Sequence, residues 1–596
     1  MNFKEIKIKE ILREFKDGDK NRSLNSLLKL IKENPDELDL SLLYGKMCLE
    51  INKLDEAEKA FLFLLSKDKN SLDYLNNIYL IYLKKNKIKE AKLYIKQILN
   101  IEPNNYVALR DSAYCEYLDQ NYREADNSFK NISSGSKRDV FALNIHALVK
   151  LNIEEIYEAK KLLENAINLN PEYIDSYNNL GKILFDLEDI DGAYLKFKDA
   201  YKINKNDYKT LVNIGNILSL KDKNYYSITA YKKALTIKNN ETEIFSNICI
   251  AYSRVKDFNN ASKYYEMVKK TNITNPSLNL SMSYLYLYKN DFSKAWALFD
   301  SRIQNRKFFT KNFDKKTINN ILNNKKEFDR NDKVLILREQ GVGEEILFSS
   351  IYPDLIRFTN NVTIESDPRL IKIFERSFNK NIFVKSGKYS TDNSQLKKFD
   401  VIIFAGSLCE KFRKNINDFP RKNYLISDLN KDHAFSKLPI FNKNKLKIGI
   451  SWKSKVSVYG NLKSLNLTDF KKLFKKDRQF FNLQYGNVNK EIKNFNKEKP
   501  LINCFDKVDL FNDFESCISL LKNLDVFVTI SNSTAHIAGA LGIKTILICP
   551  KKSSTYFYWS NEKQFNPWYN NIIILRITKS IKDTINKVDK ILKSYE

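Results

Sequence analysis

Apolar positions follow a helical period through the first half of the chain and short, strand-like runs through the second. In the first half, small residues return every 34 residues, as in tandem structural repeats. They are Ser23, Ala57, Ala91, Ala125, Ala159, Ala193, Ser227, Ala261 and Ala295. A second series runs twelve positions earlier, at Gly45, Ala113, Ala147, Gly181, Gly215, Cys249 and Ser283, with Tyr79 as the bulky exception. Two series in one register predict paired helices that approach closely where small side chains meet.

A 34-residue unit with two amphipathic helices resembles the tetratricopeptide repeat (TPR). Pro35, Pro103 and Pro171 keep twice the same spacing. We therefore predict N-terminal helices over residues 1–35, then a TPR α-solenoid of about eight repeats over residues 36–306. Stacked repeats form a groove that commonly binds extended peptides or partner proteins. A purely structural or oligomerising solenoid is the alternative.

The second half predicts an α/β architecture, so the fold class is α plus α/β. Residues 307–332 are polar, rich in Lys and Asn, and are expected to be a linker. Short apolar runs alternating with helical stretches then predict parallel sheets covered by helices. The predicted strands are 334–337, 362–365, 382–385, 401–405, 447–452, 480–484, 526–530, 545–549 and 572–575. A proline-containing segment divides them into two Rossmann-like domains, 333–440 and 446–596, with a ligand cleft at the carboxyl ends of the strands.

Residues 525–550 read as a strand, a polar turn, a short helix and a second strand. The turn, Ser531, Asn532, Ser533 and Thr534, supplies side chains that cap a helix. The first helical turn and the helix dipole suit a phosphate or diphosphate. His536 lies one turn inside, where a neutral or protonated imidazole reaches the same anion. An ordinary capped crossover helix with a hydrogen-bonded histidine is the alternative, since one capped helix is a weak signal.

Three further polar groups follow predicted strands. Residues 339–344 include Glu339, Gln340, Gly341, Gly343 and Glu344, where the glycines permit a tight turn and a carboxylate can accept a proton. A helix first turn enriched in Glu to match the dipole is the alternative. The second group is Ser451, Lys453 and Lys463, whose lysines can neutralise a diphosphate unless they are ordinary surface charges. Gln484 and Tyr485 form the third, in a turn where a base or ribose can pack.

Composition narrows the partners. The formal charge of +28 suggests nucleic acid as a possible partner. However, the lysines are spread along the whole chain, which favours compositional bias over a nucleic-acid site. The seven cysteines show no CxxC pair and no metal-ligand spacing, as expected for reduced thiols in a cytoplasm. We find neither a signal peptide nor an apolar stretch that could span a membrane. We therefore expect a cytoplasmic protein without a bound metal.

The second half resembles the heptosyltransferase-like glycosyltransferases of GT-B fold, especially bacterial forms fused to TPR arrays. The motifs that carry the resemblance are EQGVGEEILFSSIYP, GISWKS, LQYG, DF at Asp513 and Phe514, SNSTAHIAGALG and NPWY, in consistent order over residues 333–576. The layout is also similar to that of the TPR-containing O-GlcNAc transferases, which present protein acceptors on a solenoid.

This resemblance implies metal-independent transfer of a sugar from a nucleotide diphosphate sugar, which is a co-substrate and not a cofactor. The acceptor would be a hydroxyl of a protein, peptide or glycan. Glu344 falls on the family's proposed general base and His536 on its histidine near the donor phosphates. The expected donor-binding residues are Gly341, Gly343, Ser451, Lys453, Lys463, Gln484, Tyr485, Ser531, Asn532, Ser533 and Thr534.

Two departures from the family pattern leave a second function open. Glu344 stands where the family usually has Asp, and Ser531 where an Asp often opens the last motif. The alternative is therefore a TPR scaffold or adaptor whose degenerate transferase domain binds a nucleotide without catalysis. Nucleic-acid binding rests on composition alone.

Overall fold

The computed structural model places the chain in two compact units, Met1–Ile217 and Leu218–Glu596, which we describe separately. The described residues are 3–133, 139–305, 313, 318–319, 321, 328–339, 341–389, 393–420, 422–441, 444–454, 463–497, 502–505, 508–549, 556–559, 566–578 and 580–596. Gln340 and most of the predicted linker lie outside them. The boundary between the units falls inside one helix of the repeat array.

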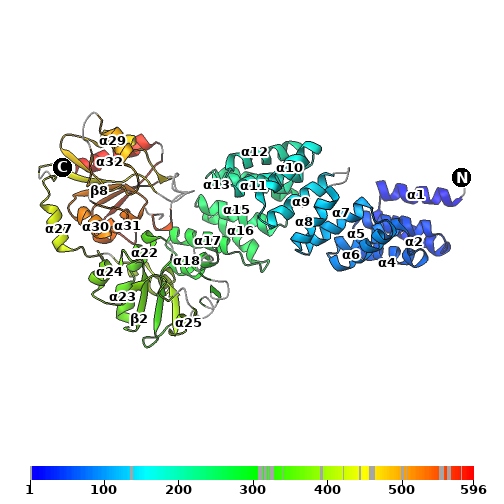
Figure 1. Cartoon of the computed structure of the whole chain (residues 1–596), viewed down its shortest axis with the longest axis horizontal. Helices are drawn as coiled ribbons and strands as arrows, with labels where there is room; N and C mark the ends of the chain where they lie inside the picture. Colours follow the sequence, from blue (N-terminus) through cyan, green and yellow to red (C-terminus); the bar gives the residue numbers. More distant parts are fainter. Residues whose placement is uncertain are drawn as a thin grey trace. The chain divides into compact units, whose positions relative to one another are not determined.

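The first unit consists of paired helices (Figure 1). They are α1 (Phe3–Asp17), α2 (Lys20–Glu33), α3 (Leu38–Glu50), α4 (Leu54–Lys67), α5 (Leu72–Lys84), α6 (Ile88–Ile101), α7 (Tyr106–Leu118), α8 (Tyr122–Ser133), α9 (Val140–Asn152), α10 (Ile156–Leu169), α11 (Ile174–Asp186), α12 (Ile190–Ile203) and α13 (Tyr208–Leu220), which crosses the boundary. The second unit continues the array with α14 (Asn224–Ile237), α15 (Thr242–Arg254), α16 (Phe258–Lys269), α17 (Pro276–Lys289), α18 (Phe292–Phe299) and the short α19 (Ser301–Asn305). The predicted run of solenoid helices is confirmed.

The small residues of the two series lie where paired helices cross. A Cβ atom added to Gly45 would stand 2.8 Å from the Phe61 ring, and one added to Gly181 would stand 2.5 Å from the Phe197 ring. In the last pair, the Ser283 hydroxyl donates a hydrogen bond of 2.7 Å to the carbonyl of Ala295. The 34-residue register therefore records helix contacts.

A third series of the same period was not found in the sequence. Residues in the left-handed region, with φ between 58° and 66°, occupy the turn between the two helices of successive pairs. They are Asn52, Asn86, Gln120, Glu154, Glu188, Asp222, Lys256 and Asn290. Sequence alone hid this series because its members share a backbone conformation and not a side-chain type.

Two parallel sheets follow the solenoid, and all nine predicted strands are present. The first sheet has the order β3-β2-β1-β4 and consists of β1 (Val334–Leu337), β2 (Val362–Ser366), β3 (Phe383–Lys385) and β4 (Val401–Phe404). The second has the order β10-β9-β8-β5-β6-β7. Its strands are β5 (Leu446–Ile450), β6 (Arg478–Asn482), β7 (Ile502–Asn503), β8 (Val526–Ile530), β9 (Thr545–Cys549) and β10 (Ile572–Arg576). The two-residue β7 was missed because it is too short to show a pattern.

Each sheet and its helices form one lobe of the second unit. The first lobe carries α22 (Val342–Ser349), α23 (Tyr352–Phe358), α24 (Ile371–Phe378), α25 (Asn393–Leu396), η1 (Ala405–Leu408), α26 (Cys409–Phe412) and η2 (Ile416–Asp418). The second lobe carries η3 (Leu467–Leu473), α29 (Asn489–Phe495), α30 (Phe514–Lys522), α31 (Ser533–Leu541), η5 (Phe557–Trp559) and α32 (Ile581–Lys593), and α27 (Leu429–Ser436) lies between the lobes in sequence. One hydrophobic core contains residues of both lobes and of α17 and α18.

The last helices of the solenoid are tied to the first lobe by buried polar contacts. The Trp296 indole donates a 2.7 Å hydrogen bond to the carbonyl of Arg413. Arg302 makes two hydrogen bonds of 2.8 Å to the Glu339 carboxylate, and both side chains are fully buried. Glu339, which the sequence grouped with the candidate site residues, is therefore part of a structural ion pair.

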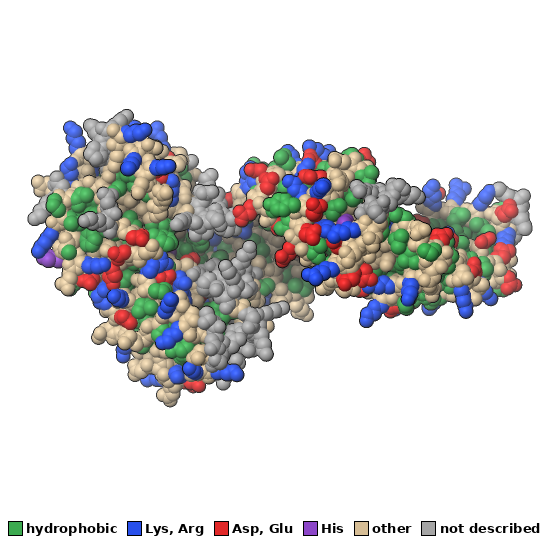
Figure 2. Space-filling view, in the orientation of Figure 1, with side chains coloured by type: hydrophobic (Ala, Val, Ile, Leu, Met, Phe, Trp, Pro, Cys, Tyr) green, Lys and Arg blue, Asp and Glu red, His purple; other side chains and the backbone are tan. Residues whose placement is uncertain are grey.

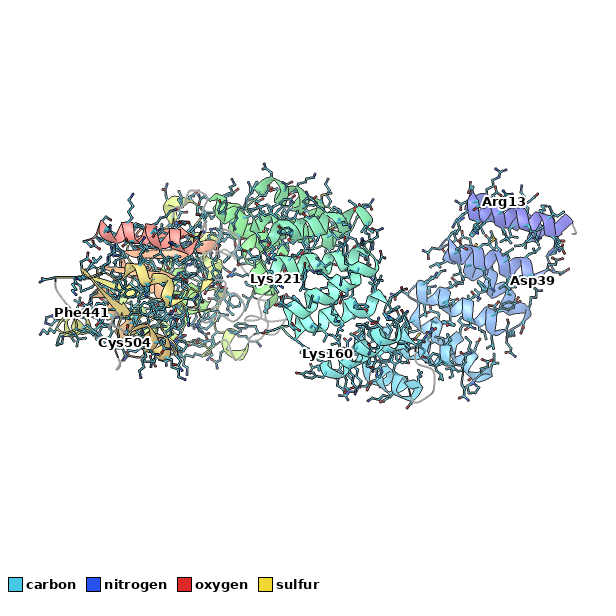
Figure 3. The ribbon with its side chains drawn as sticks, turned by 90° about the horizontal axis from the view of Figure 1, so that it is seen from above. Arg13, Asp39, Lys160, Lys221, Phe441 and Cys504 are labelled. Carbon is cyan, nitrogen blue, oxygen red and sulfur yellow. The ribbon has the colours of Figure 1, made fainter. Side chains whose placement is uncertain are left out.

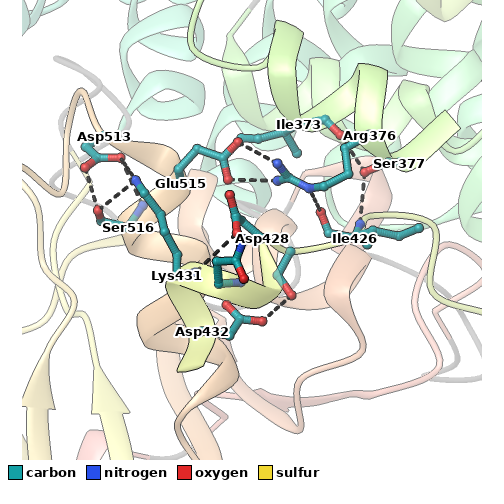
Figure 4. A network of polar contacts seen from close by, with 12 residues as sticks. Ile373, Arg376, Ser377, Ile426, Asp428, Lys431, Asp432, Asp513, Glu515 and Ser516 are labelled. Atoms are coloured by element: carbon teal, nitrogen blue, oxygen red, sulfur yellow. Dashed lines mark hydrogen bonds and ion pairs between the residues drawn. The ribbon is translucent and has the colours of Figure 1, made fainter. Parts of the chain in front are cut away.

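A polar network joins the two lobes along one side (Figure 4). Arg376 of α24 donates two hydrogen bonds, of 3.0 and 2.8 Å, to the Glu515 carboxylate on α30. Arg376 Nε also donates to the carbonyl of Ile426, whose N–H donates to the Ser377 hydroxyl, both at 2.9 Å. The bidentate Arg376–Glu515 pair fixes orientation as well as distance.

The visible surface carries mixed charges (Figure 2), and most cysteines are buried. On the face in Figure 2, Lys and Arg side chains are interspersed with Asp and Glu and do not form one basic area. Six of the seven cysteines are buried free thiols, and Cys504, which directly follows β7 and is labelled in Figure 3, is partly exposed. Within the described part of the chain, every helix is too short or too polar to cross a lipid bilayer.

Candidate functional site

A cavity of about 550 Å³ lies in the second unit, lined by residues that follow strands of both sheets. From the first lobe it is lined by Gly341, Val342, Gly343, Glu344 and Arg369. From the second it is lined by Ser454, Lys463, Tyr485, Leu510, Phe511, Phe514, Ser531, Asn532, Ser533, His536, Tyr556 and Tyr558. Nine predicted site residues therefore share one cavity: Gly341, Gly343, Glu344, Lys463, Tyr485, Ser531, Asn532, Ser533 and His536. Ser451, Lys453, Gln484 and Thr534 are not among its lining residues.

The turn between β8 and α31 forms one edge of the cavity. Asn532 is the N-cap of α31, and its Oδ1 accepts a 3.0 Å hydrogen bond from the N–H of Ala535. The Ser531 hydroxyl accepts a 2.9 Å hydrogen bond from the Trp559 indole. Ser533, the first helical residue, is half-buried and lines the cavity, whereas Thr534 is buried. The first turn of α31 thus presents its positive end to the cavity.

His536 is buried and neutral. Its Nδ1 lies 2.9 Å from the Tyr569 hydroxyl, and the Trp559 and Tyr558 rings lie 4.7 and 4.8 Å from the imidazole centroid. Burial, followed by the charge of Lys463, lowers the pKa of His536 to about 3. At neutral pH the imidazole therefore offers a ligand hydrogen bonding but no positive charge. Of the two protonation states that the sequence allowed, the pKa favours the neutral one.

Lys463 is a buried cation in the cavity wall. Its side chain is only 5% exposed, and its Nζ lies 3.8 Å from the centroid of the Tyr556 ring. Burial lowers the pKa of Lys463 to about 8, an effect that the nearby Glu344 carboxylate partly offsets. The ammonium is thus still mostly charged at neutral pH, and an anionic ligand would restore the stabilisation that burial removes.

Lys453 lies elsewhere. Its Nζ pairs with the Glu491 carboxylate at 2.6 Å, and it does not line the cavity. Of the two lysines predicted to face a diphosphate, only Lys463 lines the cavity, and its role there stays a prediction. The sequence could not separate them because they are the same residue type on the same connection.

Ser451, Gln484 and Asn532 join the ends of three neighbouring strands. Gln484 Oε1 accepts hydrogen bonds from the backbone N–H groups of Trp452 (2.8 Å) and Lys453 (2.7 Å), and the Asn532 amide donates to the Ser451 hydroxyl (2.6 Å). Gln484 Nε2 donates to the carbonyl of Tyr485. These three side chains form hydrogen bonds with other protein groups, and they therefore fix the edge of the cavity.

Glu344 lies in the first turn of α22, opposite Lys463. Its Oε1 is 3.4 Å from the Tyr558 hydroxyl of the other lobe. Gly343 has a role different from the predicted tight turn: a Cβ atom there would stand 2.9 Å from the His536 ring, and neither Gly341 nor Gly343 has a positive φ. Gly343 instead lets α22 approach α31, so that Glu344 reaches the cavity.

Sequence reasoning missed Arg369. Its guanidinium makes hydrogen bonds of 2.8 and 2.9 Å to Asp367, donates to the carbonyl of Phe511 at 2.9 Å, and lies 4.6 Å from the Phe514 ring centroid. Ser366, Asp367 and Arg369 lie at the carboxyl end of β2, so the strand-end rule that found the other groups would have found this one.

One family model matches a helix pair of the solenoid, and two curated proteins match part of the chain. The tetratricopeptide repeat family matches residues 72–105, which contain α5 and α6. Protein FlbA of Caulobacter vibrioides is 24% identical over 268 residues, covering 41% of this chain and 43% of FlbA. Human Protein O-mannosyl-transferase TMTC3 is 22% identical over 267 residues, covering 44% of this chain and 26% of TMTC3. The chain thus spans less than half the length of these two relatives.

A solved tetratricopeptide repeat protein from Parabacteroides merdae is 19% identical, with a TM-score of 0.37, and covers 41% of this chain and 98% of its own. Together with the helix pairs, the family match shows a TPR solenoid, a type of array that commonly binds proteins. Among the described residues, no three His, Cys, Asp or Glu side chains gather as metal ligands would.

Proposed function

We propose that the two lobes form a GT-B glycosyltransferase of the heptosyltransferase-like type, with Rossmann-like domains over residues 333–440 and 446–596. The enzyme would transfer a sugar from a nucleotide diphosphate sugar to an acceptor hydroxyl. The observation that carries this proposal is the pairing, in one cavity, of a buried cation beside a helix N-terminus with a carboxylate from the other lobe.

The donor diphosphate would bind at Lys463 and the first turn of α31. Lys463 supplies the positive charge, and the backbone N–H groups at the start of α31 supply oriented donors. The neutral His536 would contribute a hydrogen bond instead of a charge. These groups would offset the charge of the diphosphate without a metal ion, and metal independence stays a prediction.

Glu344 would act as the general base. It would take the proton of the acceptor hydroxyl while that oxygen bonds to the anomeric carbon of the sugar. The bond between this carbon and the diphosphate oxygen breaks, and its electron pair leaves with the nucleoside diphosphate, whose charge Lys463 stabilises.

The solenoid, with repeats over residues 36–306 and residues 307–332 as a linker, would bind a protein partner or a protein, peptide or glycan acceptor. TMTC3 is named as a protein O-mannosyl-transferase, which agrees with a TPR array serving a glycosyltransferase.

The first test is binding. The full chain is heated with ADP, GDP, UDP or CDP, or with their sugar derivatives, and one nucleotide series is expected to raise the melting temperature. Lys463→Met should lose this shift in melting temperature. Lys471→Met, which replaces an exposed lysine in η3, is the control and should keep it. The absence of any shift in the wild type would argue against a nucleotide-sugar enzyme.

The second test is turnover. Glu344→Gln is expected to lower kcat for sugar transfer by roughly 10²- to 10⁴-fold, because the base is lost, while the nucleotide-induced melting shift is retained. Full transfer by Glu344→Gln would remove Glu344 from the proposed role.

A catalytically silent TPR scaffold is the second candidate. It is favoured by Ser531, whose hydroxyl is used to hold Trp559 where relatives of this type often carry a charged Asp. Nucleotide binding without transfer to any acceptor would support the scaffold and contradict the enzyme.

A further inference from the structure

The segment Tyr556–Trp559 forms one wall of the cavity and contacts three of its ionisable groups, Lys463, Glu344 and His536. Tyr556 lies under the Lys463 ammonium, and Tyr558 lies beside both Glu344 and His536. The Trp559 ring is tilted by 31° against the His536 ring, and its indole donates to the Ser531 hydroxyl. The position of this short segment therefore affects how these side chains are arranged around the cavity.

Phe557 of the same segment points toward the solenoid. Its ring is stacked on Tyr284 of α17, with centroids 5.4 Å apart and planes 11° apart. The ring of Phe299 of α18 meets it edge-on at 5.5 Å and 71°. Phe557 is only 9% exposed, so the last helix pair of the solenoid covers the back of the cavity wall.

The helices that hold Phe557 are themselves fixed to the opposite lobe. α18 is tied to the first lobe through Trp296 and Arg413, and α19 through Arg302 and Glu339. The wall segment, in contrast, belongs to the second lobe. The end of the solenoid thus contacts both lobes: α18 and α19 bond to the first lobe, and α17 and α18 pack on Phe557 of the second.

We infer that Tyr284 and Phe299, in the last TPR helix pair, are positioning residues for the nucleotide cavity, because they hold Tyr556 and Tyr558 through Phe557. This inference rests on the proposed function for the identity of the ligand. It makes the end of the solenoid part of the nucleotide site, in addition to any partner that the repeats bind.

The test uses three variants of the full chain. Tyr284→Ala removes the ring that stacks on Phe557, and Tyr284→Phe retains it. Tyr286→Ala is the matched control: Tyr286 is also half-buried on α17, but its ring packs on Phe258 inside the solenoid, 5.7 Å away. A general weakening of α17 would affect Tyr286→Ala as much as Tyr284→Ala.

Amide hydrogen exchange of the Tyr556–Trp559 segment is the first readout, since the Trp559 N–H is bonded to the carbonyl of Tyr556. Exchange is expected to be at least about threefold faster in Tyr284→Ala and unchanged in Tyr284→Phe and Tyr286→Ala. The second readout is the affinity for whichever of ADP, GDP, UDP and CDP binds the wild type most tightly. This affinity is expected to fall by about 3- to 10-fold in Tyr284→Ala alone.

Exchange that is equal in Tyr284→Ala and Tyr286→Ala would overturn the inference, and so would faster exchange with unchanged nucleotide affinity. If the wild type bound none of the four nucleotides, the proposed function would fail, and the exchange comparison would still decide whether the solenoid holds the wall.

Discussion

Gly45 and Gly181 lie four repeats apart in the solenoid and do the same thing: each leaves room for a phenylalanine ring of the paired helix. Lys453 and Lys463 lie ten residues apart in the second lobe and do different things, since one pairs with Glu491 and the other faces the cavity. In a repeat array, the register of a residue defines its role. In the α/β lobes, a role depends on contacts with residues that are distant in sequence.

The largest expected effect contrasts a buried ion pair with an exposed one. Glu339→Gln leaves Arg302 buried with less compensation, so the free energy of unfolding of the second unit should fall by about 3 kcal/mol. In the solenoid, Glu164→Gln breaks only the exposed pair with Lys160 and should cost less than about 0.5 kcal/mol. Denaturant unfolding of the full chain measures both. Equal losses would contradict the distinction.

The next effect separates the two lysines. Lys463→Met should weaken nucleoside diphosphate binding by about 30-fold, because it removes a charged hydrogen-bond donor from a buried site. Lys453→Met should change affinity by less than about twofold, since Lys453 pairs with Glu491. Calorimetric titration of both variants would sharpen the comparison, and a larger loss for Lys453→Met would reverse it.

The pH dependence of binding should follow Lys463. Its pKa of about 8 means that it is charged below pH 8 and neutral above. Affinity for a diphosphate should therefore fall by about tenfold between pH 7 and pH 9. Lys463→Arg stays charged over this range and should remove the dependence. An unchanged slope in Lys463→Arg would assign the titration to another group.

The smallest effect tests the repeat register. Gly181→Ala gains helix propensity but forces the Phe197 ring to move, and Phe197→Leu makes room. The two changes should couple by about 1 kcal/mol, so that the double variant is more stable than the sum of the single variants predicts. Strict additivity in unfolding measurements would mean that the glycine is not needed for the ring.

Much of the fold could be predicted because it depends on local patterns. The 34-residue period marked the helix pairs, and short apolar runs marked nine strands, whereas β7 was too short to see. Strand ends also placed Glu344, Lys463 and Ser533 near one another, since parallel strands bring their carboxyl ends to one edge.

The rest depended on distant partners that no local pattern encodes. Glu339 and Glu344 are five residues apart, yet Glu339 forms a buried ion pair with Arg302, whereas Glu344 lines the cavity. His536 is neutral because Tyr558, Trp559 and Tyr569 bury it. The support of Phe557 by Tyr284 crosses from the solenoid to the second lobe.

The stability of the solenoid could be raised by substitutions at its left-handed turns. Each of the eight turn residues carries a Cβ in a region that costs an ordinary residue about 1 kcal/mol, and only Asn52, Asn86, Asp222 and Asn290 are of a type that tolerates it well. Glycine would relieve this cost at the other turns, although greater freedom of the unfolded chain would take back part of the gain. Because the turns recur once per repeat, such gains would add along the array, and its thermal tolerance could be raised stepwise without altering a residue that lines the cavity of the second unit.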